Sequence, residues 1–102
     1  MAKHKLEVIL NGEFTGIDIA IEGKQIVPRE INDNDYYKLF PEFVIQNPLN
    51  IHVRLDSWFS MKWKLIIKVD DIELFSKKGE IDNKGYVTFT EEINIKDEKD
   101  NI

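Results

Sequence analysis

The side chains that most often carry catalysis are scarce in this chain of 102 residues. It has no cysteine, which excludes a thiolate nucleophile, a thiolate metal site and a disulfide framework. Its two histidines are His4 and His52. A general base needs a partner within hydrogen-bond reach, and the sequence contains no Ser–His–Asp arrangement or nucleophile elbow that would supply one. We therefore expect a protein that is not an enzyme and that binds no cofactor.

Carboxylates are more abundant, and one run of them resembles a calcium loop. In Asp33-Asn34-Asp35, however, two tyrosines follow where the EF-hand pattern needs further ligands, and helix capping or turn formation is the commoner role of such a run. The acidic residues at Asp70-Asp71, Asp82 and Glu91-Glu92 would form a calcium site only if they converged at one end of the fold, which the sequence leaves open. We predict no metal site.

The two tryptophans suggest two different roles. Trp63 shares the alternation of its apolar neighbours, which predicts a core position beside Phe89 and Phe59. Trp58 lies in a connection between apolar segments. If it is exposed, Trp58 would anchor a protein partner or stack on a sugar ring, and otherwise it would close one end of the fold as a lid.

The elements that position these residues are predicted most clearly between residues 49 and 74. Apolar side chains alternate with polar ones over 49–55 and again over 61–69, which is the period of half-buried β-strands. With Asp70-Asp71 as a two-residue turn, the second segment forms a hairpin with the residues that follow. The predicted opposed pairs are Val69 with Ile72, Ile67 with Leu74, and Lys68 with Glu73.

One residue, Ile66, breaks the alternation of this hairpin. The predicted register places Ile66 opposite Phe75 on the outer face, among lysines. An apolar pair on a charged face is either covered by another part of the chain, with 32–48 as the candidate, or offered to a protein partner or a second copy. We therefore select Ile66, Phe75 and Trp58 as the candidate contact residues for a partner or ligand.

Further strands are predicted on both sides of this region. Apolar residues alternate over 6–10 and 17–21, and Gly23-Lys24 is predicted to form a tight turn that places Ile21 opposite Ile26, followed by a short edge strand that ends at Pro28.

The remaining segments carry weaker patterns. Residues 36–40 are predicted to form at most one helical turn, capped by Asp35, with a short strand over 43–45. Loop 56–60 joins two strands of a hairpin or two different sheets. A last strand over 87–95 is expected to contain a bulge or a break near Glu91-Glu92.

These patterns predict an all-β fold: a single-domain antiparallel β-sandwich of about seven short strands over residues 1–95, with a small β-barrel as the alternative. Residues 96–102 are predicted to be a disordered polar tail. The net charge of −5 and the presence of only two arginines argue against nucleic acid or an anionic membrane as partner. No apolar run is long enough to span a membrane, and the lack of cysteine favours a cytoplasmic location.

For function, the sequence predicts a non-catalytic protein-interaction or assembly module that binds a protein partner or self-associates. The alternative is a small-ligand module that binds carbohydrate through Trp58 with Tyr36 or Tyr37 and nearby polar side chains.

Overall fold

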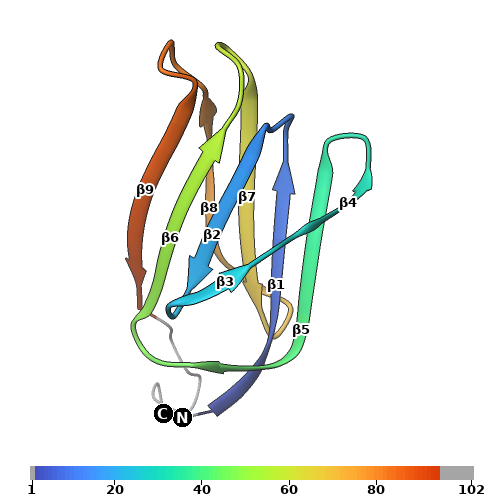
Figure 1. The fold of residues 1–102 in the computed structure, drawn as a ribbon. Coiled ribbons are helices and arrows are strands. Elements are labelled where there is room, and N and C mark those ends of the chain that lie inside the picture. Colours follow the sequence, from blue (N-terminus) through green and yellow to red (C-terminus); the bar gives the residue numbers. More distant parts are fainter. Residues whose placement is uncertain (1, 95–102) are drawn as a thin grey trace.

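The computed structural model describes residues 2–94 as two antiparallel sheets packed face to face (Figure 1). The first sheet has the strand order β4-β5-β1-β7-β8 and the second has the order β3-β2-β6-β9. The sheets are not closed into a barrel, so the predicted all-β sandwich is confirmed. The nine strands are β1 (Ala2–Asn11), β2 (Gly16–Ile21), β3 (Lys24–Ile26), β4 (Arg29–Asn32), β5 (Asp35–Ile45), β6 (Leu49–Asp56), β7 (Lys62–Val69), β8 (Ile72–Glu80) and β9 (Tyr86–Ile93).

The core lies between the sheets and is built from every second residue of the central strands. Because successive side chains of a strand point to opposite faces, each alternating segment contributes one buried row. The fully buried rows come from β1, β2, β6 and β7, and they comprise Leu6, Val8, Leu10, Ile19, Ile21, Leu49, Ile51, Val53, Leu55, Leu65 and Ile67. Residues 2–94 contain no helix long and apolar enough to cross a membrane.

The middle of the chain differs from the sequence prediction. Residues 35–45 form the strand β5, which pairs with β1, where a helical turn over 36–40 was predicted. Asn34 has a positive φ of 66° and turns the chain from β4 into β5. Tyrosine and phenylalanine favour strands, and pairing with β1 outweighs the local capping preference of the aspartates. The sandwich consequently has nine strands instead of about seven.

The hairpin of β2 and β3 turns one residue earlier than predicted. Glu22 and Gly23 occupy the turn with positive φ values of 53° and 74°, so Ile26 lies opposite Ile19 and not opposite Ile21. After β3, residues 27 and 28 carry the chain across one side of the sandwich to β4 in the first sheet (Figure 1).

The structure also tests two predictions for the C-terminal half of the chain, on loop 56–60 and on the last strand. β6 and β7 belong to different sheets, which is the second of the two predicted arrangements for loop 56–60. β9 pairs with β6 over its whole length without a register shift, so the prediction of a bulge or a break near Glu91-Glu92 is wrong. The predicted tail, 96–102, lies outside the described residues.

Candidate functional site

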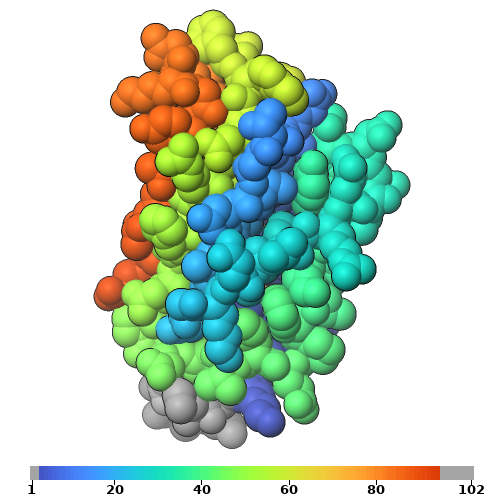
Figure 2. All heavy atoms as spheres, in the orientation of Figure 1, coloured from blue at the N-terminus to red at the C-terminus, as the bar shows by residue number. Residues whose placement is uncertain are grey.

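Two large aromatic side chains, Trp58 and Phe59, lie exposed in the connection between β6 and β7. Trp58 is 54% exposed and Phe59 is 69% exposed. They belong to the 57–60 loop, which lies at the end of the sandwich that also carries the β8–β9 turn (Figure 2). The prediction that Phe59 joins the core is therefore wrong. Trp58 leaves half of its surface to solvent, so it is not a buried lid.

The backbone of the 57–60 loop is held by hydrogen bonds to the neighbouring turns. Ser57 N–H donates to the Gly85 carbonyl at 2.9 Å, and Ser60 N–H donates to the Ile81 carbonyl at 2.8 Å. The buried Ser57 hydroxyl donates to the carbonyl of Glu13 in the β1–β2 loop. Because three segments are tied together here, the two aromatic side chains are presented on a fixed backbone.

Phe75, the second predicted contact residue, does not lie on the outer face. The register of β7 and β8 shifts between Ile67 and Lys68, so Phe75 lies opposite Ile67 and points into the sandwich. The predicted pairs of Val69 with Ile72 and of Lys68 with Glu73 are confirmed. The shift leaves Leu74 as the extra residue, and the predicted pair of Ile67 with Leu74 is wrong.

Ile66 does lie on the outer face, but with different neighbours from those predicted. It lies opposite Ser76 on β8 and opposite Ile9 on β1, and Ile9 in turn lies opposite Tyr37 on β5. Segment 32–48 thus extends the same sheet and does not cover Ile66. Ile66 is half-buried, and its apolar neighbour Ile9 lies beside it because β1 pairs with β7.

The side of the sandwich between the edge strands β8 and β9, called the open edge here, is filled by aromatic side chains. The ring of Phe89 stacks on Trp63 with centroids 5.8 Å apart and lies 6.2 Å from the ring of Phe75. Trp63 is only 4% exposed, so its predicted core position beside Phe89 is confirmed. Lys77 Nζ lies 4.5 Å from the centroid of Phe89 and 3.4 Å from Glu91 Oε1. The register of β9 opposite Ile51 places Glu91 on the inner face, and Lys77 provides a partner of opposite charge for it there.

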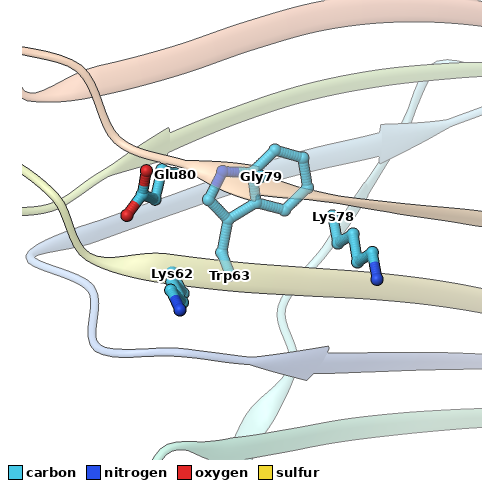
Figure 3. A pocket seen from close by; sticks show the side chains of 5 residues that line it. All are labelled: Lys62, Trp63, Lys78, Gly79 and Glu80. Carbon is cyan, nitrogen blue, oxygen red and sulfur yellow. The ribbon is translucent and has the colours of Figure 1, made fainter.

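A shallow hollow lies beside the open edge, where β7 and β8 run together (Figure 3). Its lining residues are Lys62, Trp63, Lys78, Gly79 and Glu80. The indole of Trp63 lies over Gly79, the residue opposite it on β8, where an added Cβ would lie 3.2–3.3 Å from the ring. The buried Nε1 of Trp63 has no hydrogen-bond partner among the described residues.

The histidines and the acidic turns make local contacts with side chains of neighbouring elements. His4 Nδ1 lies 2.6 Å from Asp70 Oδ2, and this hydrogen bond lowers the pKa of Asp70. His52 Nδ1 lies 2.8 Å from Thr90 Oγ1 on the outer face of the second sheet. Asp70 and Asp82 belong to turns at opposite ends of β8, and residues 2–94 contain no cluster of three potential metal ligands.

The two tyrosines suggested for sugar binding are separated from each other. Tyr36 packs inward against Phe14, with ring centroids 5.8 Å apart. Tyr37 points to the opposite face, where its hydroxyl donates to Glu7 Oε2 at 2.6 Å, and this bond raises the pKa of Tyr37. Because adjacent strand residues face opposite sides, at most one of them can share a site with Trp58.

Comparisons with known proteins leave the site to be interpreted from its own geometry. No protein-family model, curated protein or solved structure matches this chain.

Proposed function

We propose that this protein is a non-catalytic protein-interaction module whose contact site is the 57–60 loop. The observation that carries the proposal is the exposure of two consecutive aromatic side chains, Trp58 and Phe59, on a backbone held by hydrogen bonds. Aromatic residues of this kind supply most of the binding energy at many protein interfaces. A fixed backbone lowers the ordering entropy that binding would otherwise cost. The cysteine-free composition favours the cytoplasm as the compartment in which it works.

Ile66 contributes to this proposal less than the sequence suggested. Its predicted partner, Phe75, faces the core, and its neighbours across the sheet are Ile9 and Ser76. Among residues 2–94, Trp58 and Phe59 are the aromatic residues among the exposed large hydrophobic side chains, whereas Ile66 is half-buried. Ile66 therefore remains a secondary contact candidate.

The test compares affinity capture by the wild type with capture by a W58A/F59A variant. The matched control is Ile72→Ala, since Ile72 is 59% exposed and lies in the turn region at the other end of β8. We expect a specific partner to be retained by the control and lost by the double variant. With that partner purified, truncation of two anchor residues should raise the Kd by at least about 30-fold.

Two results would contradict the proposal. One is a set of captured proteins that is identical for the wild type, the loop variant and the Ile72→Ala control, with all three equally folded by circular dichroism. The other is a saturable change of tryptophan fluorescence with one member of a glycan panel, abolished by Trp58→Ala, which would favour the carbohydrate alternative. We expect a flat response across that panel.

A further inference from the structure

Residues 2–94 present four edge strands, and three of them carry features that discourage pairing with another chain. β3 has only three residues, and the register of β4 against β5 shifts between Glu30 and Asn32. β8 has the register shift described above. Short, bulged or internally charged edges resist the addition of a strand. β9 differs, because its eight residues pair with β6 without a shift and its inward charge, Glu91, is neutralised by Lys77.

The backbone of β9 has hydrogen-bonding groups available on the side away from β6. The hydrogen bond from Ser57 N–H to the Gly85 carbonyl flanks the pair of Asp56 and Tyr86. In an antiparallel ladder this makes Asp56–Tyr86 a non-hydrogen-bonded pair, so the N–H and C=O of Tyr86 point away from β6. The same orientation recurs at every second residue, namely at Thr88, Thr90 and Glu92.

We propose that β9 pairs antiparallel with β9 of a second copy of this chain, about a two-fold axis at Phe89. In this register Thr88 lies opposite Thr90 of the second copy, and Tyr86 lies opposite Glu92 of the second copy. All four outward-facing residues then exchange backbone hydrogen bonds, and the second sheets of the two copies become one continuous sheet.

Charge favours a second copy as the occupant of this edge. Both glutamates of β9 lie at its C-terminal end, whereas its N-terminal end carries Tyr86 with the guanidinium of Arg54 4.4 Å from the ring centroid. Asp56 accepts from Nε and Nη2 of Arg54, which leaves Nη1 for another carboxylate. The two-fold axis brings Glu92 of each copy to this end of the other, so each glutamate approaches a guanidinium and not the glutamates of the second copy.

The open edge provides an apolar surface in the same place. Phe89 and Phe75 are only partly buried in the single chain. Phe89 would lie opposite its own copy in a non-hydrogen-bonded pair, the position at which side chains of neighbouring strands come closest. The aromatic cluster of Trp63, Phe75 and Phe89 would then continue from one copy into the other.

The test is the solution mass of the full chain, measured by sedimentation at several concentrations. We expect a dimer for the wild type. Thr90→Pro removes a backbone N–H that faces the second copy and no backbone bond to β6, although it also removes the hydroxyl that lies 2.8 Å from His52 Nδ1. It should raise the dimer Kd at least about tenfold, which corresponds to about 1.4 kcal/mol. The matched control is Gln25→Pro on β3. In the two-residue hairpin of β2 and β3, Ile21 and Lys24 form the hydrogen-bonded pair next to the turn, so the N–H of Gln25 also faces away from the neighbouring strand. Its mass should equal that of the wild type.

A charge pair tests the register and does not depend on proline being tolerated. T88E/T90E places glutamates opposite glutamates of the second copy and should give a monomer. T88K/T90E places lysine opposite glutamate at the same positions and should restore the dimer. A wild type that stays monomeric at millimolar concentration, or a dimer that both T90P and T88E/T90E leave intact, would overturn the proposal. W58A/F59A should leave the dimer unchanged, so this result is separable from the role of the 57–60 loop.

Discussion

The two lateral sides of the sandwich are closed in different ways. On one side, called the crossing edge here, the chain itself passes from β3 in the second sheet to β4 in the first, and Pro28 of this crossing is buried (Figure 1). On the open edge, β8 and β9 are joined only by residues 81–85 at one end. Between them, the rings of Trp63, Phe75 and Phe89 and the pair of Lys77 with Glu91 occupy the space.

The difference shows where the stability of this fold depends on side-chain chemistry. At the crossing edge, the chain itself connects the edge strands β3 and β4, so these two strands stay together whatever the exposed residues of β4 contribute to stability. The open edge is held by ring contacts and one ion pair, so each contact there can be removed by a single substitution. The open edge is also where a long, regular strand leaves its backbone available to another chain.

The largest effect is expected from Trp63→Ala. Trp63 is 4% exposed and stacks on Phe89, so removal of the indole should lower the free energy of unfolding by about 3–5 kcal/mol in urea denaturation. Trp63→Phe should cost only about 1–2 kcal/mol, because it keeps a ring and removes an unpaired buried donor. Equal losses for the two variants would show that the indole N–H is hydrogen-bonded in solution.

An intermediate effect is expected from Gly79→Ala. An added Cβ would lie 3.2–3.3 Å from the indole of Trp63, so the ring would have to move by a few tenths of an ångström against the stacked ring of Phe89. Such overpacking costs about 1–3 kcal/mol. The control is Gly23→Ala in the hairpin before the crossing edge, where nothing lies near the added Cβ but φ is +74°. That strain costs about 1–2 kcal/mol.

The two glycine effects are separated by a second substitution. In a Trp63→Phe background the cost of Gly79→Ala should fall, because the smaller ring leaves room, whereas the cost of Gly23→Ala should not change. Strict additivity of Gly79→Ala with Trp63→Phe in urea denaturation would contradict the close packing of the indole on Gly79.

These contacts also show what the sequence could and could not predict. The turn at Asp70-Asp71 was predictable because the alternation of β7 continues directly into it, and both residues have the positive φ that such turns require. The bulge at Leu74, three residues after Asp71, was not predictable, because Leu74 and Phe75 are both apolar and either satisfies the period of two. Phe75 takes the inner position, where its ring lies against Phe89, a residue remote in sequence.

The other corrections share this cause. Residues 36–40 were assigned a helical turn from the nearby aspartates, but the partner that makes them a strand is β1, about thirty residues earlier. Ile66 was paired with Phe75 because the sequence pattern showed only its hairpin neighbours, whereas its apolar neighbour across the sheet, Ile9, belongs to β1. For Trp58, exposure was one of the two predicted alternatives. For Phe59, a core position was predicted, and its exposure makes that prediction wrong.

The smallest effect is expected at the ion pair of Lys77 and Glu91 on the open edge. Their side chains are 40% and 38% exposed, so solvent and salt screen the attraction between them. A double-mutant cycle with Lys77→Met and Glu91→Gln should give a coupling free energy of about 0.2–1 kcal/mol, and it should shrink in high salt.

Which of the two single substitutions lowers the free energy of unfolding more is more informative than the size of either loss. Glu91→Gln leaves Lys77 above the ring of Phe89, where a cation is stabilised by the aromatic face, so the loss should be small. Lys77→Met leaves an inward-facing carboxylate without a partner at an apolar edge and should cost more. If Glu91→Gln proved the more damaging, the carboxylate, and not the lysine over Phe89, would be the group that holds the two edge strands together.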